Sequence, residues 1–413
     1  ESLPMRLSYL GLFATAVWLL KDAVSRDWLV AGFVVGTCIA ALEAVQQWQA
    51  HVAFRPDGNL GNANLLAALV AMAVPLAAGR ALRRGFMALA WAAGAVVLVA
   101  GLLVTTSRSG GLGVMAGCLA LLTLAVPRRF GPAVGAVSAG LVVAAVLVIL
   151  ASPLRGLNDD PASLRLNLWQ DGLRLIAARP LTGWGEDATG LVFGHYLSRD
   201  YASLVTFDRV HSGPLDVAAT QGVLGLAALG WVLFVLLRSA WRHRDAQGVA
   251  PLAAALAGYS VWVAFNFDWA PATGVWWLLA GTLWAGLPPH PDPPRQAGRG
   301  SPWRLAIAVS LVVAAVVFAV FPLLADVWYL KGRSDLAVRV DPLQAQYHWA
   351  IGTLPELRRA AELGETTPDL YVQLGDAEAR AGDRAAARRA YERALEIDPY
   401  FTPASQRLAA LGG

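Results

Sequence analysis

The sequence predicts an all-α protein: a polytopic bundle of transmembrane helices followed by a C-terminal helical repeat domain. Hydrophobic residues make up 56% of the 413 residues and charged residues only 15%, whereas a soluble domain usually carries about 25% charged residues. Uncharged windows close to the ~20 residues that span a bilayer recur along the chain. The last stretch is instead polar and carries the pattern of a helical repeat.

Hydropathy predicts about ten membrane spans. The clear candidates are residues 85–107, 131–154, 217–237, 248–267, 269–289 and 305–325, and the weaker ones are 7–20, 28–42, 59–79 and 109–127. Because these windows are too long for barrel strands and lipid offers no partner to unpaired backbone groups, helices are expected. Cys38 and Cys118 fall inside expected spans, where small buried apolar side chains are ordinary, so no disulfide is expected.

Basic residues between the spans predict the orientation of the bundle. Alternating spans place four groups of arginines on one side, namely Arg80, Arg83 and Arg84, then Arg128 and Arg129, then Arg238, Arg242 and Arg244, then Arg295, Arg299 and Arg304. By the positive-inside rule that side is cytoplasmic. The long loop 152–213 and all residues after 325 are then expected on the outer side. Residue 1 also falls outside, so we expect an odd number of further spans before it.

Two arginines stand out on the predicted outer side. Arg108, in TTSRSGG, lies in a tight turn between two spans, where a snorkelling arginine is the alternative interpretation. Arg165 belongs to SLRLNLWQDGLRLIAARPLTGWG, which predicts an amphipathic helix ended by Pro180 and followed by a glycine-rich turn. A helix that simply lies in the headgroup region is the alternative for this segment.

Further polar residues share the outer side. Arg55 precedes Asn62 and Asn64 at the start of a span; helix capping explains one amide, and the cluster suggests a polar pocket. Asp268 lies between two spans, where an acid is costly unless it is paired or faces a water-filled cavity. His211 and Ser212 open the apolar run VHSGPLDVAATQGVLGLAALG, and a structural, hydrogen-bonded histidine is the alternative there.

Several motifs together resemble one family. His211, Ser212, nine residues, Gly222, two residues and Gly225 resemble the pattern of the O-antigen ligase and polymerase superfamily, and GNLGNANLLAA, SRSGG and RLNLWQDGLRLIAARPLTGWG precede it in order. The resemblance covers roughly residues 28–287. It implies a membrane glycosyltransferase of the GT-C type in the bacterial inner membrane. Such enzymes transfer a glycan from undecaprenyl diphosphate to an acceptor hydroxyl on the periplasmic face, as in lipopolysaccharide biosynthesis, without a metal or other cofactor.

The chemistry fits the residues that carry this resemblance. Two arginines can hold a diphosphate through bidentate hydrogen bonds, and we expect Arg108 and Arg165 to do so, with Arg55 as a third candidate. His211 is the candidate general base, because an imidazole with an ordinary pKa of ~6.5 accepts a proton near neutral pH. Asp268 is expected to orient this histidine or to balance its charge. Asn62, Asn64 and Ser212 are candidates for the pocket or the acceptor site.

The C-terminal tail forms a separate unit. Residues 369–399 match a tetratricopeptide repeat, with Tyr371 and Gly375 on its first helix and Tyr391 on its second. Residues 336–363 resemble a degenerate preceding repeat, and residues 401–411 a capping helix. We therefore expect a transmembrane glycosyltransferase domain at 1–328, including the periplasmic loop 152–213, and an extracytoplasmic repeat domain at 329–413.

The expected partners are a lipid-linked glycan donor, a lipid or protein acceptor, membrane lipids and a protein partner of the repeat domain. The chain carries no dense basic patch with interleaved aromatic residues, so nucleic acid is not expected. Asp159 and Asp160 lack DxD spacing, and the six histidines show neither HxH nor HExxH, so no metal is expected.

Three alternative functions stay open. A polysaccharide polymerase of the same superfamily differs from a ligase only in its acceptor, and the motifs do not separate the two. An intramembrane serine hydrolase would use Ser109 or Ser212 as nucleophile and His211 as base, although neither serine sits in an elbow motif. A transporter would show matching broken helices in two repeated halves, a symmetry that the sequence lacks.

Overall fold

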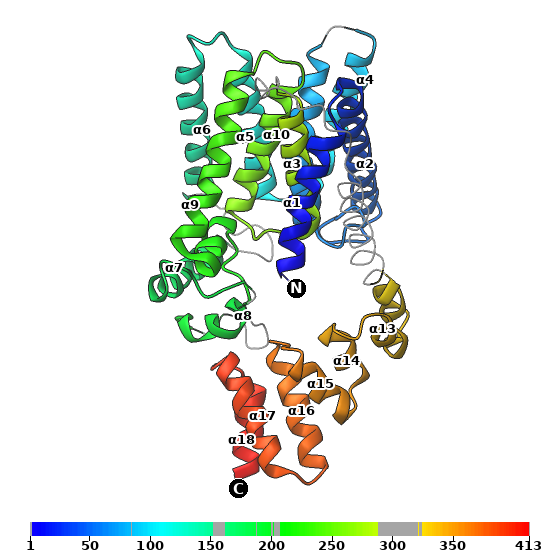
Figure 1. Cartoon of the computed structure of the whole chain (residues 1–413), viewed down its shortest axis with the longest axis vertical. Coiled ribbons are helices and arrows are strands. Elements are labelled where there is room, and N and C mark those ends of the chain that lie inside the picture. Colours follow the sequence, from blue (N-terminus) through cyan, green and yellow to red (C-terminus); the bar gives the residue numbers. More distant parts are fainter. Residues whose placement is uncertain are drawn as a thin grey trace, which may run out of the picture. The chain divides into compact units, whose positions relative to one another are not determined.

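The computed structural model describes residues 2–83, 85–151, 162–186, 188–199, 201, 207–287, 321 and 324–412. Every regular element in these ranges is a helix, and Figure 1 labels them along the chain. The helices divide into two compact units. The first unit comprises residues 1–186 and 210–290, and the second comprises 187–209 and 291–413.

The first unit is a bundle of apolar helices. They are α1 (Ser2–Leu19), α2 (Ala23–Gln49), α3 (Ala63–Ala81), α4 (Met87–Thr105), α5 (Arg108–Ala125), α6 (Gly131–Ala151), α7 (Ala162–Ala178), α9 (Gly213–Arg242), α10 (Val249–Ala264) and α11 (Ala270–Ala285). Each expected span corresponds to one of these helices, except 305–325, most of which lies outside the described residues. Helices α2 to α6 and α9 are long and apolar enough to cross a membrane, and α1 and α10 are shorter apolar helices.

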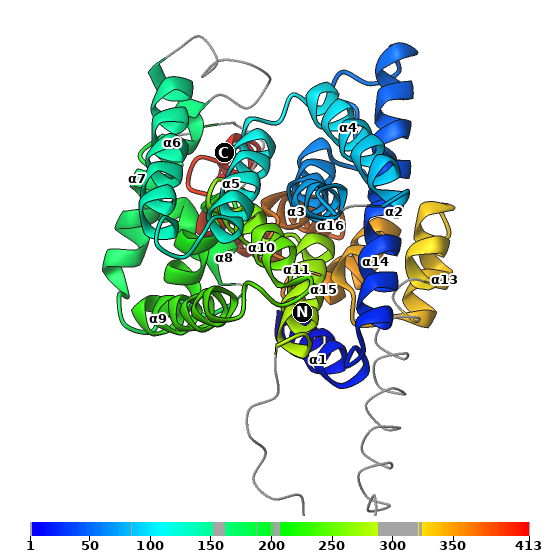
Figure 2. The same cartoon turned by 90° about the horizontal axis from the view of Figure 1, so that it is seen from above.

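Three helices form the centre of this bundle. Figure 2 shows α5 and α10 between α6 and α9 on one side and α2 and α4 on the other, with α3 beside them. Small residues allow these central helices to approach closely. Gly113 of α5 is an example, since a Cβ atom there would lie 2.9 Å from both the Ala71 Cβ of α3 and the Gly258 carbonyl oxygen of α10. The glycine therefore sets the distance between three helices.

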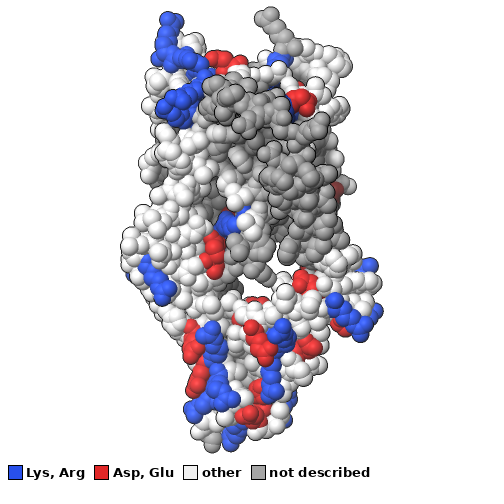
Figure 3. Space-filling view, viewed as in Figure 1, with Lys and Arg blue, Asp and Glu red and all other residues white. Residues whose placement is uncertain are grey.

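The outer helices expose apolar side chains where a soluble protein would carry polar ones. Of the apolar window of α6, 6% is buried, against 67% for α3. Val137, Leu141 and Leu147 of α6 are all at least half exposed. In Figure 3 charged side chains are sparse over the middle of the visible face of the bundle. This surface is suited to lipid, and the chain is a multi-pass membrane protein.

The second unit is helical and polar, and Figure 3 shows Lys, Arg, Asp and Glu interspersed over its visible surface. Its elements are α8 (Thr189–Val192), the 3₁₀ helix η2 (Phe193–Tyr196), α13 (Ser334–Val340), α14 (Ala345–Ile351), α15 (Leu354–Glu362), α16 (Pro368–Arg380), α17 (Arg384–Ile397) and α18 (Thr402–Gly412). The expected repeat pair is α16 and α17, and the expected capping helix is α18. A Cβ atom at Gly375 would lie 2.3 Å from the Tyr391 ring, so the glycine makes room for the tyrosine between the two helices.

A partly exposed polar cluster joins the repeat pair to its capping helix. Asp376 of α16 accepts hydrogen bonds from Tyr391 Oη at 2.8 Å and from the Arg407 guanidinium at 2.8 and 3.2 Å. Burial disfavours the charged carboxylate, but the hydrogen bonds from Arg407 and Tyr391 outweigh it, and the pKa of Asp376 lies below its ordinary value. Burial and the neighbouring carboxylate raise the pKa of Tyr391 to about 12.

The structure divides the chain differently from the expected domains. The loop expected at 152–213 within the transmembrane domain is split, because Leu191 packs on the repeat core and His195 hydrogen-bonds the Glu396 carbonyl oxygen. The second unit also begins before residue 329, since Ala325 packs with Tyr347, whose hydroxyl donates to Asp326. These contacts tie both segments to the repeat helices.

Candidate functional site

A pocket with about 680 Å³ of open space lies at one end of the first unit. Its lining residues come from the segment before α3, from α3, α5, α6 and α7, and from the end of α10: Arg55, Asn64, Thr106, Ser107, Arg108, Ser109, Leu112, Val146, Ile149, Leu150, Arg165, Leu166, Trp169 and Phe265. The three arginines that the sequence singled out separately therefore line one pocket. Asn64 also lines this pocket, whereas Asn62 does not.

Arg55 is held in place by the neighbouring helix starts. Its guanidinium donates to Asn64 Oδ1 at 2.9 Å and to the Thr105 carbonyl oxygen at 3.3 Å. Ser107 Oγ also donates to Asn64 Oδ1, at 2.9 Å, so one amide oxygen joins α3 to the start of α5. Asn62 has a different role, because its side chain accepts from the Asn64 backbone N–H at 2.8 Å and caps α3.

Arg108 is the first residue of α5, so the positive end of that helix faces the same pocket. Thr106 adopts a left-handed conformation (φ 54°), which ends α4 and turns the chain directly into α5. Ser107 then caps α5 by accepting from the Gly110 backbone N–H. The TTSRSGG turn thus places an arginine, two serine hydroxyls and a helix N-terminus together, which is an arrangement that favours anions.

Arg165 and Trp169 project from one face of α7. The Arg165 guanidinium donates to the Phe265 carbonyl oxygen, and the Trp169 ring lies 5.9 Å from the Phe265 ring. Trp169 Nε1 also donates to the His211 carbonyl oxygen, at 3.4 Å. The amphipathic helix expected here is therefore present, and it packs on the bundle at Arg165 and Trp169.

His211 lies beside the pocket but is not part of its lining. It is half-buried, its backbone is left-handed (φ 60°), and its ring meets Phe267 edge-to-face at 5.2 Å. Asp216 holds the segment before it, accepting from the Val210 backbone N–H at 2.7 Å. Ser212 is the buried N-cap residue of α9 and makes no side-chain capping hydrogen bond.

The glycine of the HS-x9-G-x2-G pattern breaks α9. Gly222 has φ 67° and ψ −165°, and a Cβ atom there would lie 2.3 Å from the Leu181 carbonyl group. The break lets the turn after α7 dock, because the Val223 N–H donates to the Pro180 carbonyl oxygen and the Trp184 N–H to that of Ala219. Gly222 therefore connects the helix that follows His211 to the turn that follows α7, the helix of Arg165.

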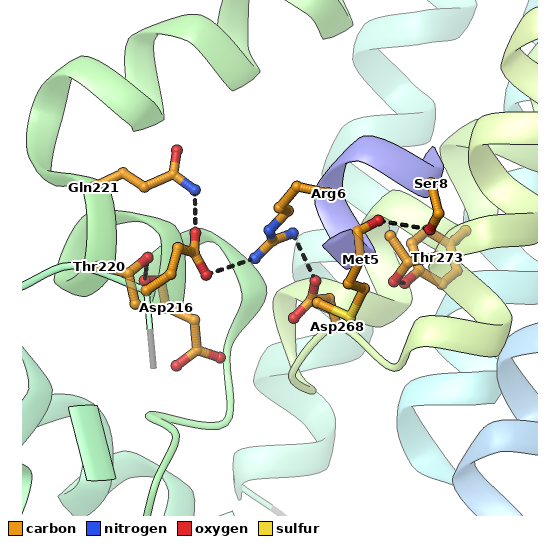
Figure 4. Close-up of polar contacts among 10 residues, drawn as sticks. Met5, Arg6, Ser8, Asp216, Thr220, Gln221, Asp268 and Thr273 are labelled. Carbon is orange, nitrogen blue, oxygen red and sulfur yellow. Dashed lines mark hydrogen bonds and ion pairs between the residues drawn. The ribbon is translucent and has the colours of Figure 1, made fainter. Parts of the chain in front are cut away.

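Asp268 makes an ion pair that the sequence did not suggest. Arg6 Nη1 of α1 donates to Asp268 Oδ2 at 2.8 Å, and Nη2 donates to Glu186 at 3.2 Å. Gln221 donates to the other oxygen of Glu186, next to the break in α9. Figure 4 shows Arg6 pointing from α1 toward Asp268. That Asp268 also orients His211 stays a prediction; its neighbour Phe267 is the residue that meets the His211 ring.

Three residues that hold the site in place were not identified from the sequence. Trp169 and Asp216 belong to the recognised motifs, but an aromatic residue or an acid in a first helical turn is ordinary by itself. Gln47 of α2 accepts from the backbone N–H groups of Asp57 and Gly58 and so shapes the loop that carries Arg55. Among the described residues, no three His, Cys, Asp or Glu side chains gather as metal ligands would.

Two segments of the chain match models of known protein families. Residues 93–230 match the family described as O-antigen ligase, and residues 368–411 match a tetratricopeptide repeat. The first match includes Arg108, Arg165 and His211, whereas Arg55 and Asp268 lie outside it. The chain matches no curated protein. In this multi-pass membrane protein, residues 93–230 are therefore similar to the O-antigen ligase family, and residues 368–411 are similar to a tetratricopeptide repeat.

Proposed function

We propose that the protein transfers a glycan from undecaprenyl diphosphate to an acceptor hydroxyl on the extracytoplasmic face of the inner membrane, without a metal. The O-antigen ligase match supports a membrane glycan-transfer role in general. The observation that carries the specific proposal is the convergence of Arg55, Arg108 and Arg165 on one pocket beside His211.

The pocket suits a diphosphate that is attached to a lipid. Arginine forms bidentate, charge-assisted hydrogen bonds with phosphate oxygens, and a helix N-terminus adds favourable potential. Val146, Ile149 and Leu150 of α6 form an apolar wall beside the arginines, where the first isoprene units would lie. A wider apolar groove, about 1350 Å³, runs between α5, α6, α9 and α10 and would receive the rest of the tail.

His211 acts as the general base in this proposal. It accepts the proton of the acceptor hydroxyl as that oxygen attacks the anomeric carbon of the donor. The bond from the anomeric carbon to the diphosphate oxygen breaks, and the diphosphate leaves with the electron pair. Arg108 and Arg165 stabilise its developing negative charge, and attack from the opposite side inverts the anomeric centre. Asp268 orients the histidine or balances its charge.

The test is transfer by the purified protein. The protein is incubated with a synthetic polyprenyl diphosphate sugar as donor. The acceptor is a lipid-core saccharide, a peptide or a second molecule of the donor. Each reaction is run with and without EDTA, and the products are identified by mass spectrometry. Transfer to the saccharide or peptide supports a ligase, whereas a ladder of donor-linked oligomers identifies a polymerase. Labelling of Ser109 or Ser212 by a fluorophosphonate, without glycan transfer, would instead support a serine hydrolase.

A further inference from the structure

A second pocket lies at the opposite end of the first unit from the candidate site. It forms where α3 and α11 end and where α2 and α10 begin, and its space of about 460 Å³ is partly open to solvent. Its polar lining includes Arg26 and Asp27 of α2, Arg80 of α3 and the following Arg83. The function proposed above assigns no role to this pocket.

Two of its three arginines are already fixed in place. The Arg26 guanidinium donates to the carbonyl oxygens of Leu20 and Lys21, at 3.0 and 2.7 Å. Arg80 pairs with Asp27 at 2.6 Å and lies over the Trp91 ring, 5.0 Å from its centroid. Because these guanidinium groups are held before any ligand arrives, a ligand would spend less free energy on ordering them.

The pocket has an excess of positive charge. Three guanidinium groups face a single carboxylate, that of Asp27. Arg83 is exposed and forms no ion pair with any residue that the structure describes. Helix α10 also begins at this pocket without a side-chain cap, after Gly248 in a left-handed conformation (φ 84°), so its first N–H groups add positive potential.

Apart from Gln247, the remaining lining is apolar. Val30, Leu76, Leu252 and Leu283 come from four different helices, and each is at most 4% exposed. A soluble anion would gain nothing from this surface. A lipid would place its phosphate among the arginines and its first methylene groups against these side chains.

We propose that this pocket binds the phosphodiester headgroup of an anionic phospholipid. The guanidinium groups of Arg80 and Arg83 hold the phosphate, and Arg26 contributes charge from a fixed position. Asp27 competes with the phosphate for Arg80 and so weakens binding. The proposal concerns lipid binding alone and holds whichever glycan the protein transfers.

The test measures lipid retention by native mass spectrometry of the full chain released from detergent. Phosphatidylglycerol should stay bound, phosphatidylcholine should be lost, and glycerol phosphate should not displace the lipid at equal concentration. Arg83→Gln should weaken retention of phosphatidylglycerol about fivefold, the typical contribution of one basic residue near an anionic lipid surface. Arg83 is exposed, so the variant should fold, and thermal unfolding in detergent checks this.

Two further variants make the test specific. Arg129→Gln, an exposed arginine in the loop between α5 and α6 and outside the pocket, should leave retention unchanged. Asp27→Asn should strengthen retention, because it frees Arg80, and a purely structural role for this pair predicts no gain. Equal retention of both lipids, equal losses in Arg83→Gln and Arg129→Gln, or displacement by glycerol phosphate would each overturn the proposal.

Discussion

The three pocket arginines differ in what already holds them. Arg55 donates to the Asn64 side chain and the Thr105 carbonyl oxygen, and Arg165 donates to the Phe265 carbonyl oxygen. Arg108 is positioned instead as the first residue of α5. A guanidinium carries five N–H donors in a planar fork, so an arginine that is hydrogen-bonded to the protein can still contact a phosphate.

Arg108→Ala and Arg165→Ala should each weaken binding of a polyprenyl diphosphate. Removing one partner of a buried charge pair typically costs about 2 to 5 kcal/mol, so the dissociation constant should rise at least tenfold. Lysine at either position should restore only part of the affinity, since an ammonium cannot form the planar fork. Binding of a fluorescent lipid analogue to the detergent-solubilised protein measures the effect.

Arg179→Ala is the matched control for this experiment. Arg179 follows α7 directly, is exposed and packs over the Trp184 ring, but it does not line the pocket. Its removal should leave the dissociation constant unchanged. Equal affinity of the wild-type protein for a lipid monophosphate and a lipid diphosphate would contradict the diphosphate clamp.

His211→Ala should abolish transfer while leaving donor binding nearly intact, because the histidine acts on the acceptor. General-base assistance typically contributes ~10²- to 10⁴-fold, so the turnover number should fall by that factor. Wild-type turnover should also fall at acid pH, since a protonated imidazole cannot accept a proton, and this acid limb should disappear in the variant. Rate measurements from pH 5 to 9 at saturating donor check both expectations. Lost donor binding with unchanged turnover at saturating donor would make His211 a phosphate ligand.

The sequence predicts those site residues that belong to recognisable motifs. Arg108, Arg165 and His211 carry side chains whose chemistry is specific, and each stands in a short pattern on the same predicted side of the membrane. Trp169 could not be predicted, because its contact with the His211 carbonyl oxygen depends on how α7 packs beside α9. Asp216 could not be predicted either, because its contact with the Val210 N–H depends on how the chain turns into α9. A sequence contains no direct record of such packing.

At the level of elements, the break in α9 at Gly222 allows this helix to contact the turn after α7. Gly222→Ala should destabilise the protein, since a Cβ atom would meet the Leu181 carbonyl group at 2.3 Å in a backbone conformation that side chains avoid. The turn after α7 should separate from α9, and Arg165 should lose its alignment with His211. Thermal unfolding in detergent, together with transfer activity, measures both effects.

Gly230→Ala provides the control on the same helix. Among the described residues, no atom outside the adjacent backbone of α9 lies within 4 Å of a Cβ placed at Gly230, so this substitution should keep or slightly raise stability. A Gly222→Ala protein as stable and active as the Gly230→Ala protein would show that the break can close without consequence.

The second element-level link is Arg6, which ties α1 to the loop between α10 and α11. That loop also provides Phe267, which meets His211, so Arg6→Ala should slow turnover with little change in donor affinity. Arg6→Ala and Asp268→Asn should be less than additive in free energy of activation, by about 0.5 to 3 kcal/mol, because both remove the same contact. A double-mutant cycle on the rate constants tests this coupling.

The exposed ion pair of Arg128 and Asp245 is the control for that double-mutant cycle. Its partners are 61% and 76% exposed, against 30% and 13% for Arg6 and Asp268. An exposed pair of this kind typically contributes about 0 to 1 kcal/mol, so its cycle, measured on stability, should show little coupling. Full additivity at Arg6 and Asp268 would remove the role of this ion pair in the site.

The elements themselves were largely predictable, and their irregularities were not. Hydropathy located the helices of the bundle because lipid demands long apolar segments with internally bonded backbone. It gave no sign of the break in α9, since Gly222 stands in an apolar run as an ordinary small residue. It also gave no sign of the Arg6–Asp268 pair, whose partners are separated by 262 positions and meet only after the bundle has folded.

At the scale of the whole molecule, the segment between α7 and α9 belongs to both units. Residues 162–186 pack with the bundle, whereas α8 and η2 pack with the repeat helices. A Cβ atom at Gly194 would lie 2.4 Å from the Ile397 carbonyl oxygen, so this contact is close. The basic residues between the spans predict that the loop 152–213 and all residues after 325 lie outside, so we expect the repeat unit on the extracytoplasmic side.

Cysteine accessibility tests this topology, after the native cysteines Cys38 and Cys118 are replaced by alanine. Single cysteines are then placed at exposed positions: Val52 and Ser405 for the predicted outer side, and Leu82 and Gln247 for the cytoplasmic side. The outer pair should react with a membrane-impermeant thiol reagent in intact spheroplasts. The inner pair should react only after permeabilisation, because the arginine-rich loops that contain them are retained in the cytoplasm.

The pattern of labelling distinguishes two ways in which the predicted topology could be wrong. Protection at position 405 with reaction at position 52 would place the repeat unit in the cytoplasm, so it could not present acceptors to the pocket. Reaction at positions 82 and 247 with protection at position 52 would show that the bundle has the opposite orientation. The pocket of Arg55, Arg108 and Arg165 would then open to the cytoplasm. In that case a donor exposed on the outer leaflet could not reach it, and the extracytoplasmic transfer proposed here would be wrong.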